Sequence, residues 1–314
     1  APRCPPFNVK IHHSLDRSPA HGRGVVMAIG FFDGVHRGHR EILRALLRLR
    51  TPGRLATVLS FENHPLTHLR PGTEPPLITT TGERVNLLAR AGIDELYLVP
   101  FDERIARLEW RPFLELLVER LGVRALVVGE NFRFGAGREG DVAAAREFFA
   151  ARGLELVALP PLYEAGDRIS STRVRSAIAS GDVAAANRLL WLPYTVRGRV
   201  VLGEGRGHDL GFPTANLAVP PEKLIPCDGV YAVVVRYDGR DWTGLVSIGS
   251  KPTFGGTERA VEAWMLDFRE TIYGEELALR DFRFIREQRA FAGVDELLAQ
   301  MRADATHATF PSFL

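Results

Sequence analysis

The stretch Gly30-Phe31-Phe32-Asp33-Gly34-Val35-His36-Arg37-Gly38-His39 decides how the front half of this chain folds. An apolar run precedes it at 25–29, and apolar residues at helical spacing follow it from Ile42 to Leu47. The pattern therefore predicts a buried strand, a glycine-rich turn and the start of a helix.

The turn has the composition of an anion-binding site. Gly34 and Gly38 permit tight turns and a close approach of the backbone to a ligand. The helix N-terminus offers N–H groups to an anion, and His36 and His39 can add donors. The alternative is a surface turn whose histidines have no role. Two glycines and two histidines in one strand-to-helix turn favour a site for nucleotide phosphates.

Outward from this stretch, strand-like and helix-like segments alternate from residue 25 to about residue 192. Strands separated by helices form a parallel sheet with both faces covered. Ligands of such sheets bind beyond the carboxyl ends of the strands, where the opening stretch lies. The predicted strands are 25–31, 55–61, 95–99, 125–129 and 154–158, and the predicted helices are 40–50, 82–91, 111–121 and 142–152.

Three more polar motifs accompany this alternation. Phe61-Glu62-Asn63-His64-Pro65 follows the second predicted strand, and Gly129-Glu130-Asn131-Phe132-Arg133-Phe134-Gly135 follows the fourth. Ile169-Ser170-Ser171-Thr172-Arg173-Val174-Arg175 leads into predicted helices at 176–180 and 183–190. Its hydroxyls and arginines suit phosphate, although a helix cap followed by solvated arginines is the alternative. Motifs at one edge of one sheet together predict a phosphate site.

After residue 192 the pattern changes to consecutive short strands separated by Gly and Pro turns. This pattern predicts a small antiparallel barrel, closed by a helix near the C-terminus. We therefore expect two domains, 1–192 and 193–314. The predicted strands are 194–202, 229–237, 241–248, 260–268 and 277–285, and the apolar stripe of the closing helix is Val294, Leu297, Leu298 and Met301.

The bulk composition excludes several classes of protein. The 314 residues include 40 basic and 38 acidic side chains, so the net charge of +2 predicts neither a nucleic-acid nor a membrane partner. No run is apolar for long enough to span a bilayer. The two cysteines, Cys4 and Cys227, have neither metal-site nor redox spacing. We expect a cytoplasmic protein and make no prediction about self-association.

The second half carries a phosphate and metal motif of its own. The stretch 203–211 fails as a dinucleotide fingerprint because Leu210 replaces the last glycine, and the chain has no P-loop. In Gly211-Phe212-Pro213-Thr214-Ala215-Asn216-Leu217, Thr214 and Asn216 lie two apart on an extended segment and share a face. Hydroxyl and amide oxygens suit Mg²⁺ held jointly with phosphates. The alternative is a turn with two local hydrogen bonds.

Glu262 is a carboxylate within an otherwise apolar predicted strand. Its alternation partners Trp264 and Leu266 share its face. A carboxylate in such a place can serve as a general base. The alternative, which the pattern alone favours, is a face that looks outward.

With these motifs the chain resembles the bacterial bifunctional riboflavin kinase/FAD synthetases over nearly its whole length. The resemblance implies an α/β N-terminal Rossmann-like nucleotidyltransferase domain and a C-terminal six-stranded antiparallel β-barrel with a closing helix. The first domain would transfer AMP from ATP to FMN, and the second would phosphorylate riboflavin. The motifs, in the family's order, are 30–39, 129–135 with Gly140-Asp141, 169–175, 211–216, 228–231, 248–254 and 261–268.

The resemblance also implies roles for individual residues. His36 and His39 match paired histidines that stabilise the ATP phosphates as pyrophosphate leaves. Glu262 matches the base that activates the ribityl 5′-hydroxyl of riboflavin, while Thr214 and Asn216 match the residues that hold Mg²⁺. The other positions implied to bind ATP or its phosphates are Gly30, Phe32, Asp33, Gly34, Gly38, Asn131, Ser170, Ser171, Thr172, Arg173, Gly205 and Gly211.

Some residues depart from the family's usual pattern. Asn63 stands where Pro is usual before His64, and His208 stands where Arg is usual. Trp191 replaces a usual Gly at the junction, and Trp264 replaces a smaller residue or His. None of these departures removes a catalytic role.

The motifs leave three other functions open. A riboflavin kinase with a degenerate front half would lack the paired histidines His36 and His39. A regulator that binds flavin or nucleotide without making product would not need Glu262, Thr214 and Asn216. An adenylyltransferase with another acceptor would not need a kinase half. The residues present favour the bifunctional enzyme, with ATP, riboflavin and FMN as substrates.

Overall fold

The computed structural model describes residues 9–16, 24–202, 213–253, 256–308 and 310. The chain forms two compact units. Unit 1 comprises Ala1–Pro75 and Thr79–Ser171, and unit 2 comprises Pro76–Ile78 and Thr172–Leu314. The domain boundary at residue 192 stays a prediction.

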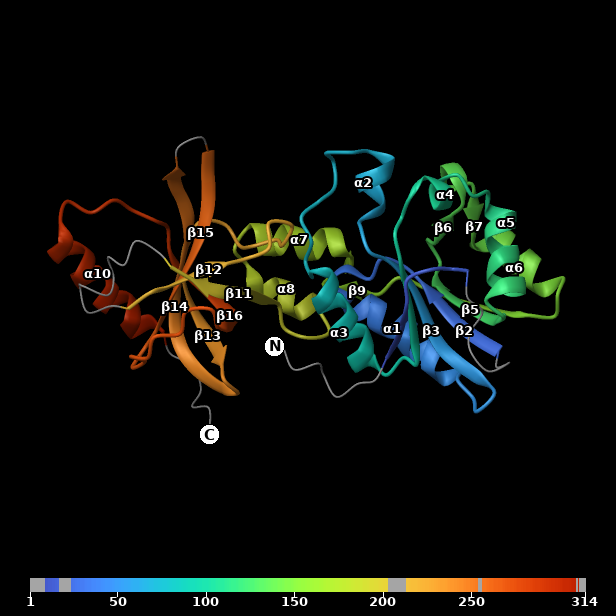
Figure 1. The fold of residues 1–314 in the computed structure, drawn as a ribbon, viewed down its shortest axis with the longest axis horizontal. Coiled ribbons are helices and arrows are strands. Elements are labelled where there is room, and N and C mark those ends of the chain that lie inside the picture. The colour runs from blue at the N-terminus through green and yellow to red at the C-terminus, as the bar shows by residue number, and fades with distance from the viewer. Residues whose placement is uncertain (1–8, 17–23, 203–212, 254–255, 309, 311–314) are drawn as a thin grey trace. The chain divides into compact units, whose positions relative to one another are not determined.

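Unit 1 is built on a parallel sheet of six strands, in the order β1-β4-β3-β2-β5-β8. Figure 1 labels three of its central strands, β2, β3 and β5. From β2 the chain adds β3 and β4 on one side and then β5 and β8 on the other. The carboxyl ends of β2 and β5 therefore form the topological switch point, where such sheets bind ligands. The strands are β1 (Lys10–His12), β2 (Gly24–Ile29), β3 (Arg54–Phe61), β4 (Glu95–Val99), β5 (Val123–Gly129) and β8 (Glu155–Leu159).

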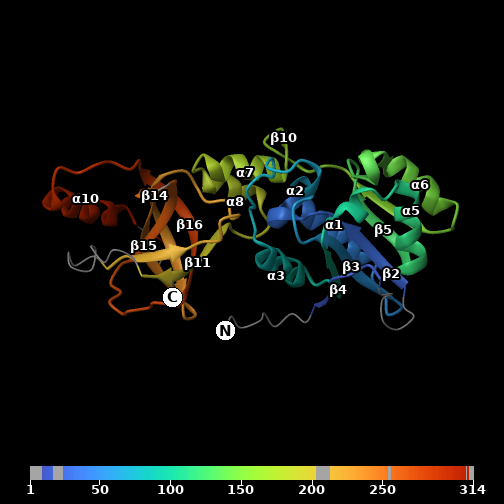
Figure 2. The ribbon, with the colours of Figure 1, turned by 45° about the horizontal axis from the view of Figure 1, so that its top comes forward.

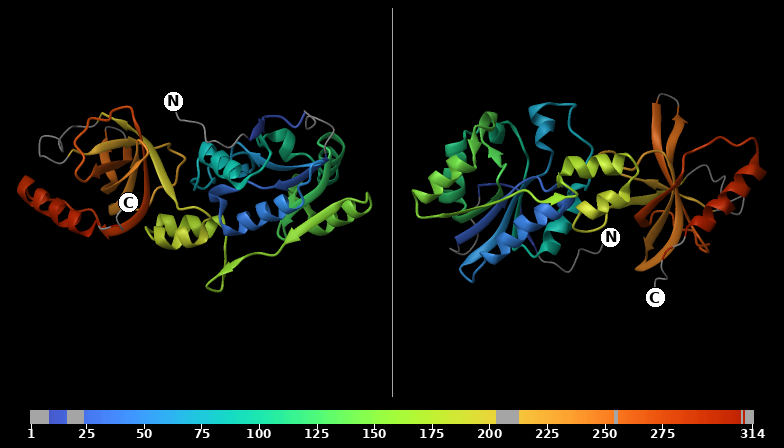
Figure 3. Two further views of the ribbon diagram at one scale, coloured as in Figure 1. Left: turned by 90° about the horizontal axis from the view of Figure 1, so that it is seen from below. Right: turned by 180° about the vertical axis from the view of Figure 1, so that it is seen from behind.

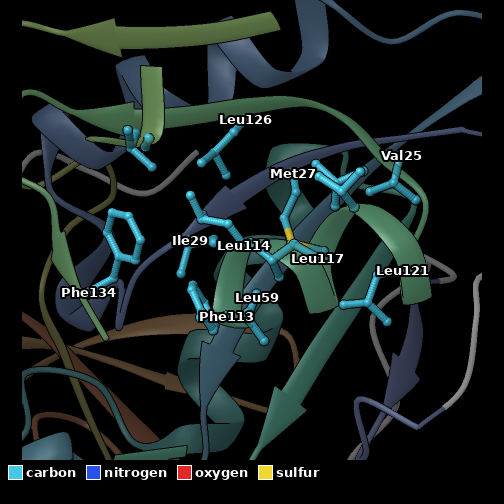
Figure 4. Close-up of a cluster of buried hydrophobic side chains, with 14 of the residues drawn as sticks. Val25, Met27, Ile29, Leu59, Phe113, Leu114, Leu117, Leu121, Leu126 and Phe134 are labelled. Atoms are coloured by element: carbon cyan, nitrogen blue, oxygen red, sulfur yellow. The ribbon is translucent and has the colours of Figure 1, made fainter. Parts of the chain in front are cut away.

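The core of unit 1 explains why β2 is apolar along its whole length. Val25, Met27 and Ile29 belong to a buried cluster on one face of the sheet, together with Phe113 and Leu117 (Figure 4). Those two come from α5 (Trp110–Glu115) and from the π-helical segment η2 (Leu116–Arg120), which replace the single helix predicted at 111–121. The alternate residues of β2 face the other way, and α1 (Arg37–Arg48) packs against this strand.

The remaining elements of unit 1 connect the strands. The hairpin of β9 and β10 extends away from the sheet (Figure 3, left). The predicted helices at 82–91 and 142–152 are α3 (Thr81–Ala91) and α6 (Val142–Ala150). The sequence pattern did not predict the short elements η1 (Asp33–Val35), α2 (Pro65–Leu69), α4 (Glu103–Ala106), β6 (Arg133–Phe134), η3 (Ala136–Arg138), β7 (Gly140–Asp141), β9 (Tyr163–Glu164) and β10 (Asp167–Arg168).

Two helices precede the barrel. The motif at 169–175 was expected to lead into a helix at 176, but α7 (Ser171–Ala179) already begins at Ser171. Because the helix starts five residues earlier than predicted, most of the motif lies inside its first two turns. The next helix, α8 (Val183–Leu189), agrees with the predicted range to one residue.

Unit 2 contains a closed antiparallel barrel of six strands in the order β11-β12-β15-β14-β13-β16. Figure 2 labels β11, β14, β15 and β16 of this barrel. It confirms the barrel that the resemblance implied. The short strand β12 is the one that the sequence pattern did not predict as a strand. The bounds are β11 (Thr195–Val201), β12 (Ala215–Ala218), β13 (Gly229–Tyr237), β14 (Arg240–Thr253), β15 (Gly256–Met265) and β16 (Glu276–Arg286).

The closing helix is α10 (Val294–His307). The predicted stripe is wrong at its first position, since Val294 is 50% exposed. The helix is instead anchored by Asp304, which is 2% exposed and accepts hydrogen bonds from Nη2 of Arg286 (2.8 Å) and Nε2 of Gln300 (2.7 Å). An ion pair between the buried Asp304 carboxylate and the partly exposed Arg286 thus contributes to the attachment. Within the described part of the chain, no helix is both long and apolar enough to cross a membrane.

Candidate active sites

The turn after β2 is conformationally strained. Phe32, Gly34 and Val35 have positive φ values of 57°, 77° and 40°. This region is unfavourable for phenylalanine and especially for the β-branched valine. Such strain persists only where the surroundings over-determine it, as they do at many functional sites.

Asp33 and Thr79 make some of the hydrogen bonds that hold the strained turn in place. The Asp33 carboxylate accepts hydrogen bonds from the backbone N–H and the hydroxyl of Thr79, both at 2.9 Å. The Thr79 hydroxyl also accepts from the Gly34 N–H at 3.0 Å, and Ser171 donates to the Asp33 carbonyl at 3.0 Å. Asp33 therefore shapes the turn from within, while Thr79 was missed because 46 residues separate it from its partner.

His36 and His39 form one stacked pair at the start of α1. His36 is the N-cap, and its Nδ1 accepts the backbone N–H of His39 at 3.2 Å. This bond places the ring proton of neutral His36 on Nε2. The two rings lie 3.6 Å apart at 16°. Burial, and the charge that His36 would add, lower the pKa of His39 well below its usual value, so His39 is neutral at pH 7.

Gly38 leaves room for this pair. A Cβ atom at Gly38 would lie 3.2 Å from both Cε1 and Nδ1 of His36, closer than ordinary van der Waals contact. Gly30 is equally close to a ring, because a Cβ there would lie 3.2 Å from Phe32. The two glycines are thus needed for packing against aromatic rings.

Arg84 lies beneath the same edge of the sheet and was missed by the sequence analysis. It is 0% exposed, and its Nη2 donates to the carbonyl of Phe61 at the end of β3 (2.5 Å). Its guanidinium lies 4.1 Å from the centre of the Phe31 ring. Burial lowers its pKa to about 10, and nearby Asp33 opposes the shift. Arg84 therefore joins the ends of two neighbouring strands and places a buried cation next to the turn.

Asn131 is paired with an arginine that the sequence analysis did not select. In the amide orientation that satisfies both side chains, its oxygen accepts from Nη1 and Nη2 of Arg168 at 2.8 and 3.1 Å. Arg168 immediately precedes the motif that contains Ser170 and Ser171. Thr172 and Arg173 belong to unit 2 and lie in the first turn of α7.

Asn63, one of the departures from the family pattern, has a structural role. Its amide donates to the carbonyl of Phe101 at 3.0 Å and accepts from the N–H of Phe101 at 2.8 Å. These bonds fix the segment after β3 to the segment after β4. The neighbouring His64 caps α2 by accepting the N–H of Leu66 at 3.2 Å.

In unit 2 the register of the barrel brings Asn216 and Glu262 together. Asn216 on β12 and Ser247 on β14 are both direct cross-strand partners of Glu262 on β15. Directly opposed residues of antiparallel strands point to the same face, with Cβ atoms about 5 Å apart. Val261 and Ala263 are buried, whereas Glu262 is half-buried on the other face. Glu262 thus lies on the outer wall of the barrel, beside an amide and a hydroxyl.

A pocket lies at the end of β15. Thr214 and Asn216 line it, together with Ala263, Met265 and the segment from Phe268 to Tyr273, whereas Glu262 is not among its lining residues. Among the described residues, no group of three or more His, Cys, Asp or Glu side chains could hold a metal ion. Hydroxyl and amide oxygens such as those of Thr214 and Asn216 are ligands of the kind that hard divalent cations share with phosphates and water. The predicted positions Gly205 and Gly211, and the departure His208, lie outside the described residues.

Comparisons with known proteins agree with this two-centre arrangement. The FAD synthetase family model matches residues 18–173, and the riboflavin kinase family model matches 190–310. The bifunctional riboflavin kinase/FMN adenylyltransferase of Escherichia coli K12 is 39% identical over 93% of both chains. The protein of that name from Listeria monocytogenes is 35% identical over 94% of this chain and 95% of the relative.

A solved structure supports the fold of both units. It is described as a macrolide-efflux protein from Streptococcus pneumoniae, and it matches with a TM-score of 0.86 at 31% identity. The match covers 97% of this chain and 99% of that chain. Two family models in order along the chain, and relatives that match over almost their full length, place the chain in the bifunctional riboflavin kinase/FMN adenylyltransferase family.

Proposed function

We propose that the turn after β2, which we call the front centre, is the site at which unit 1 transfers AMP from ATP to FMN. The observation that supports this most directly is the stacked His36–His39 pair at the N-terminus of α1, at the switch point of a parallel sheet. Helix N–H groups, glycine backbone and the Nε2–H of His36 are the donors that a polyphosphate requires.

The front reaction needs positioned donors more than a base. A phosphate oxygen of FMN attacks the α-phosphorus of ATP, the bond from that phosphorus to the bridging oxygen breaks, and pyrophosphate leaves. The phosphate of FMN is already ionised at neutral pH, with a second pKa of about 6. Catalysis then consists of orienting two anions and stabilising the charge that develops on the leaving group.

The residues around the turn divide this work. His36 donates to the departing phosphates through its Nε2–H, and neutral His39 supports the His36 ring by stacking on it. Gly30, Phe32, Asp33, Gly34 and Gly38 shape the backbone that approaches the nucleotide. Asn131 with Arg168, and Ser170 with Ser171, supply further phosphate contacts within unit 1. Thr172 and Arg173 keep the phosphate-binding role that the resemblance implies.

Riboflavin phosphorylation requires a base, because a hydroxyl is a poor nucleophile. We assign that role to Glu262. Its carboxylate accepts the proton of the ribityl 5′-hydroxyl while the oxygen of that hydroxyl attacks the γ-phosphorus of ATP. ADP leaves and FMN is formed. Asn216, opposite Glu262 in the strand register, and Thr214 in the neighbouring pocket would face the ATP phosphates.

The residues of this second centre fit a magnesium ion. The Thr214 hydroxyl and the Asn216 amide oxygen are hard neutral donors, and they border the pocket proposed for ATP. When bound, Mg²⁺ would neutralise negative charge on the phosphates. We further propose that both reactions take place in the cytoplasm, since both consume ATP, and that neither involves nucleic acid.

One assay tests the proposal. The full chain is incubated with riboflavin, ATP and Mg²⁺, and riboflavin, FMN and FAD are separated by chromatography. We expect FMN first and FAD later, with pyrophosphate released in step with FAD. FMN without FAD would contradict the role given to the front centre, and no phosphorylated flavin would contradict the role given to Glu262.

A further inference from the structure

Three residues from the front half of the sequence are incorporated into unit 2. We call Pro76–Ile78 the strap. Its middle residue lies beside Lys223 as in a parallel ladder: the Leu77 N–H donates to the Glu222 carbonyl at 2.7 Å, and the Leu224 N–H donates to the Leu77 carbonyl at 2.8 Å. The first residue is held as well, since Nε of Arg175 donates to the Pro76 carbonyl at 3.0 Å.

Lys223 holds the last residue of the strap. It is only 5% exposed, and its ammonium donates to the Ile78 carbonyl at 2.7 Å. The ammonium also lies 4.9 Å from the centre of the Tyr194 ring, whose hydroxyl donates to the Leu224 carbonyl. Removing an ammonium group from water costs free energy unless specific partners compensate for it. The contacts with the Ile78 carbonyl and the Tyr194 ring therefore stabilise Lys223 in its buried position.

The residue that follows the strap is Thr79. Its N–H and hydroxyl donate to the Asp33 carboxylate, and its hydroxyl accepts from Gly34 in the strained turn before His36. Ile78 and Thr79 share a peptide bond, so the orientation of the Ile78 carbonyl sets the plane of the Thr79 N–H. The peptide unit between Ile78 and Thr79 thus makes two hydrogen bonds. Its N–H donates to the Asp33 carboxylate in the turn after β2, and its oxygen accepts from the Lys223 ammonium.

We propose that Lys223 is a positioning residue for adenylyl transfer, although it lies within the stretch that matches the riboflavin kinase family. It acts through the peptide unit of Ile78 and Thr79, which positions Asp33 and Gly34 and so keeps the turn after β2 in its phosphate-binding conformation. The inference rests on the proposed role of the front centre. It predicts that a substitution in the kinase part of the sequence impairs FAD synthesis and leaves FMN synthesis intact.

The first test is Lys223→Met in the full chain, a substitution that preserves volume and removes the donor. We expect kcat/KM for FAD formation from FMN to fall about tenfold, because small misplacements of a catalytic turn have large kinetic effects. Riboflavin phosphorylation should stay within about twofold, which also shows that unit 2 is folded. Lys223→Arg should recover most of the lost activity because a donor is restored.

The matched control is Lys10→Met. Lys10 has a 53% exposed side chain and a 3.7 Å ion pair with Glu95 at the edge strand of the sheet. Both activities should be unchanged. An equal loss of FAD synthesis in this variant would overturn the proposal, since it would show that any lost lysine has the same effect.

A double-mutant cycle separates positioning from general stability. Thr79→Val removes the hydroxyl contacts to Asp33 and Gly34. If Lys223 acts through Thr79, the loss of kcat/KM in the double variant should be clearly smaller than the product of the two single losses. Multiplicative losses, a parallel fall of both activities, or unchanged FAD synthesis in Lys223→Met would each overturn the inference.

Two further arms complete the test. If Lys223→Met cannot be purified, Arg175→Leu releases the Pro76 end of the strap and should give the same selective loss; equal loss of both activities would overturn the inference. A wild-type chain that makes no FAD from FMN and ATP would overturn the proposed function itself. A wild-type chain that makes FAD, together with insensitive variants, would overturn the strap inference alone.

Discussion

The two centres of this protein are built by different means. The front centre depends on one strained turn held by non-local hydrogen bonds, as in the contacts of Asp33 with Thr79. The back centre depends on the register of a closed barrel, which places Asn216 opposite Glu262 without any unusual backbone at either residue. A ladder with many hydrogen bonds tolerates local change better than a turn with a few contacts. We therefore expect the front centre to be sensitive to packing and the back centre to be sensitive mainly to chemistry.

The largest expected effect is that of Glu262→Gln, which removes a base and keeps the shape. FMN formation should fall about 10²- to 10⁴-fold, the usual contribution of general base catalysis. FAD formation from supplied FMN should be unchanged. The measurement is initial rates of both products by chromatography, with exposed Glu276→Gln on β16 as the matched control. Wild-type kinase activity in Glu262→Gln would contradict the assignment.

His39→Ala should have the opposite selectivity. It removes the ring that stacks on His36 at 3.6 Å, so the donor to the phosphates loses its support. We expect FAD formation from FMN to fall about 10²-fold, the scale seen when one donor to a developing charge is lost. Riboflavin phosphorylation, measured on the same preparation, should be unaffected. Equal loss of both activities would mean that the two centres are not independent.

Gly38→Ala is a smaller change that tests how tightly the front centre is packed. The new methyl group would lie 3.2 Å from the His36 ring and should push it aside, so we expect FAD synthesis to fall about fivefold to tenfold. The control is Gly82→Ala in the first turn of α3, where a Cβ would meet no atom within 4 Å. That variant should be fully active. If both variants behave alike, close packing at His36 is not needed.

The smallest effect is on stability and depends on pH. The pKa of His39 lies well below 6.5 in the folded chain, whereas the unfolded chain titrates near 6.5. Below about pH 6.5 the unfolded state therefore binds more protons, and the free energy of unfolding decreases as pH falls. Between about pH 7.5 and 5.5, Tm should fall a few degrees more for wild type than for His39→Gln. An identical slope for both would contradict a buried neutral His39.

Much of the fold could be predicted from the sequence because its signals are local. The predicted strand at 95–99 coincides with β4, and that at 229–237 coincides with β13. In both strands every or nearly every residue is buried, so the apolar runs are unambiguous. The start of α1 was predicted three residues late, because its cap is a histidine, and not one of the Ser, Thr, Asp or Asn residues that usually mark such starts.

The parts of the sites that were missed depend on contacts between distant residues. Arg84 reads as an ordinary charged helix residue, and only the fold brings it beneath Phe31. Arg168 gains its partner Asn131 from a loop 37 positions earlier, and no local pattern marks that pair. Strand β12 is four residues long and follows Pro213, so its β signal is weak. Sequence patterns therefore identified many candidate site residues, but not the residues that hold them.

The burial of Lys223 also makes it a chemical reporter. The chain has three lysines, Lys10, Lys223 and Lys251. An amine-reactive reagent can modify Lys223, which is 5% exposed, only when its surroundings open. The rate of its labelling, read by mass spectrometry against the 53% exposed side chain of Lys10, would measure how often the peptide that it holds is released. The same measurement with ATP or riboflavin present would show which substrate closes that opening.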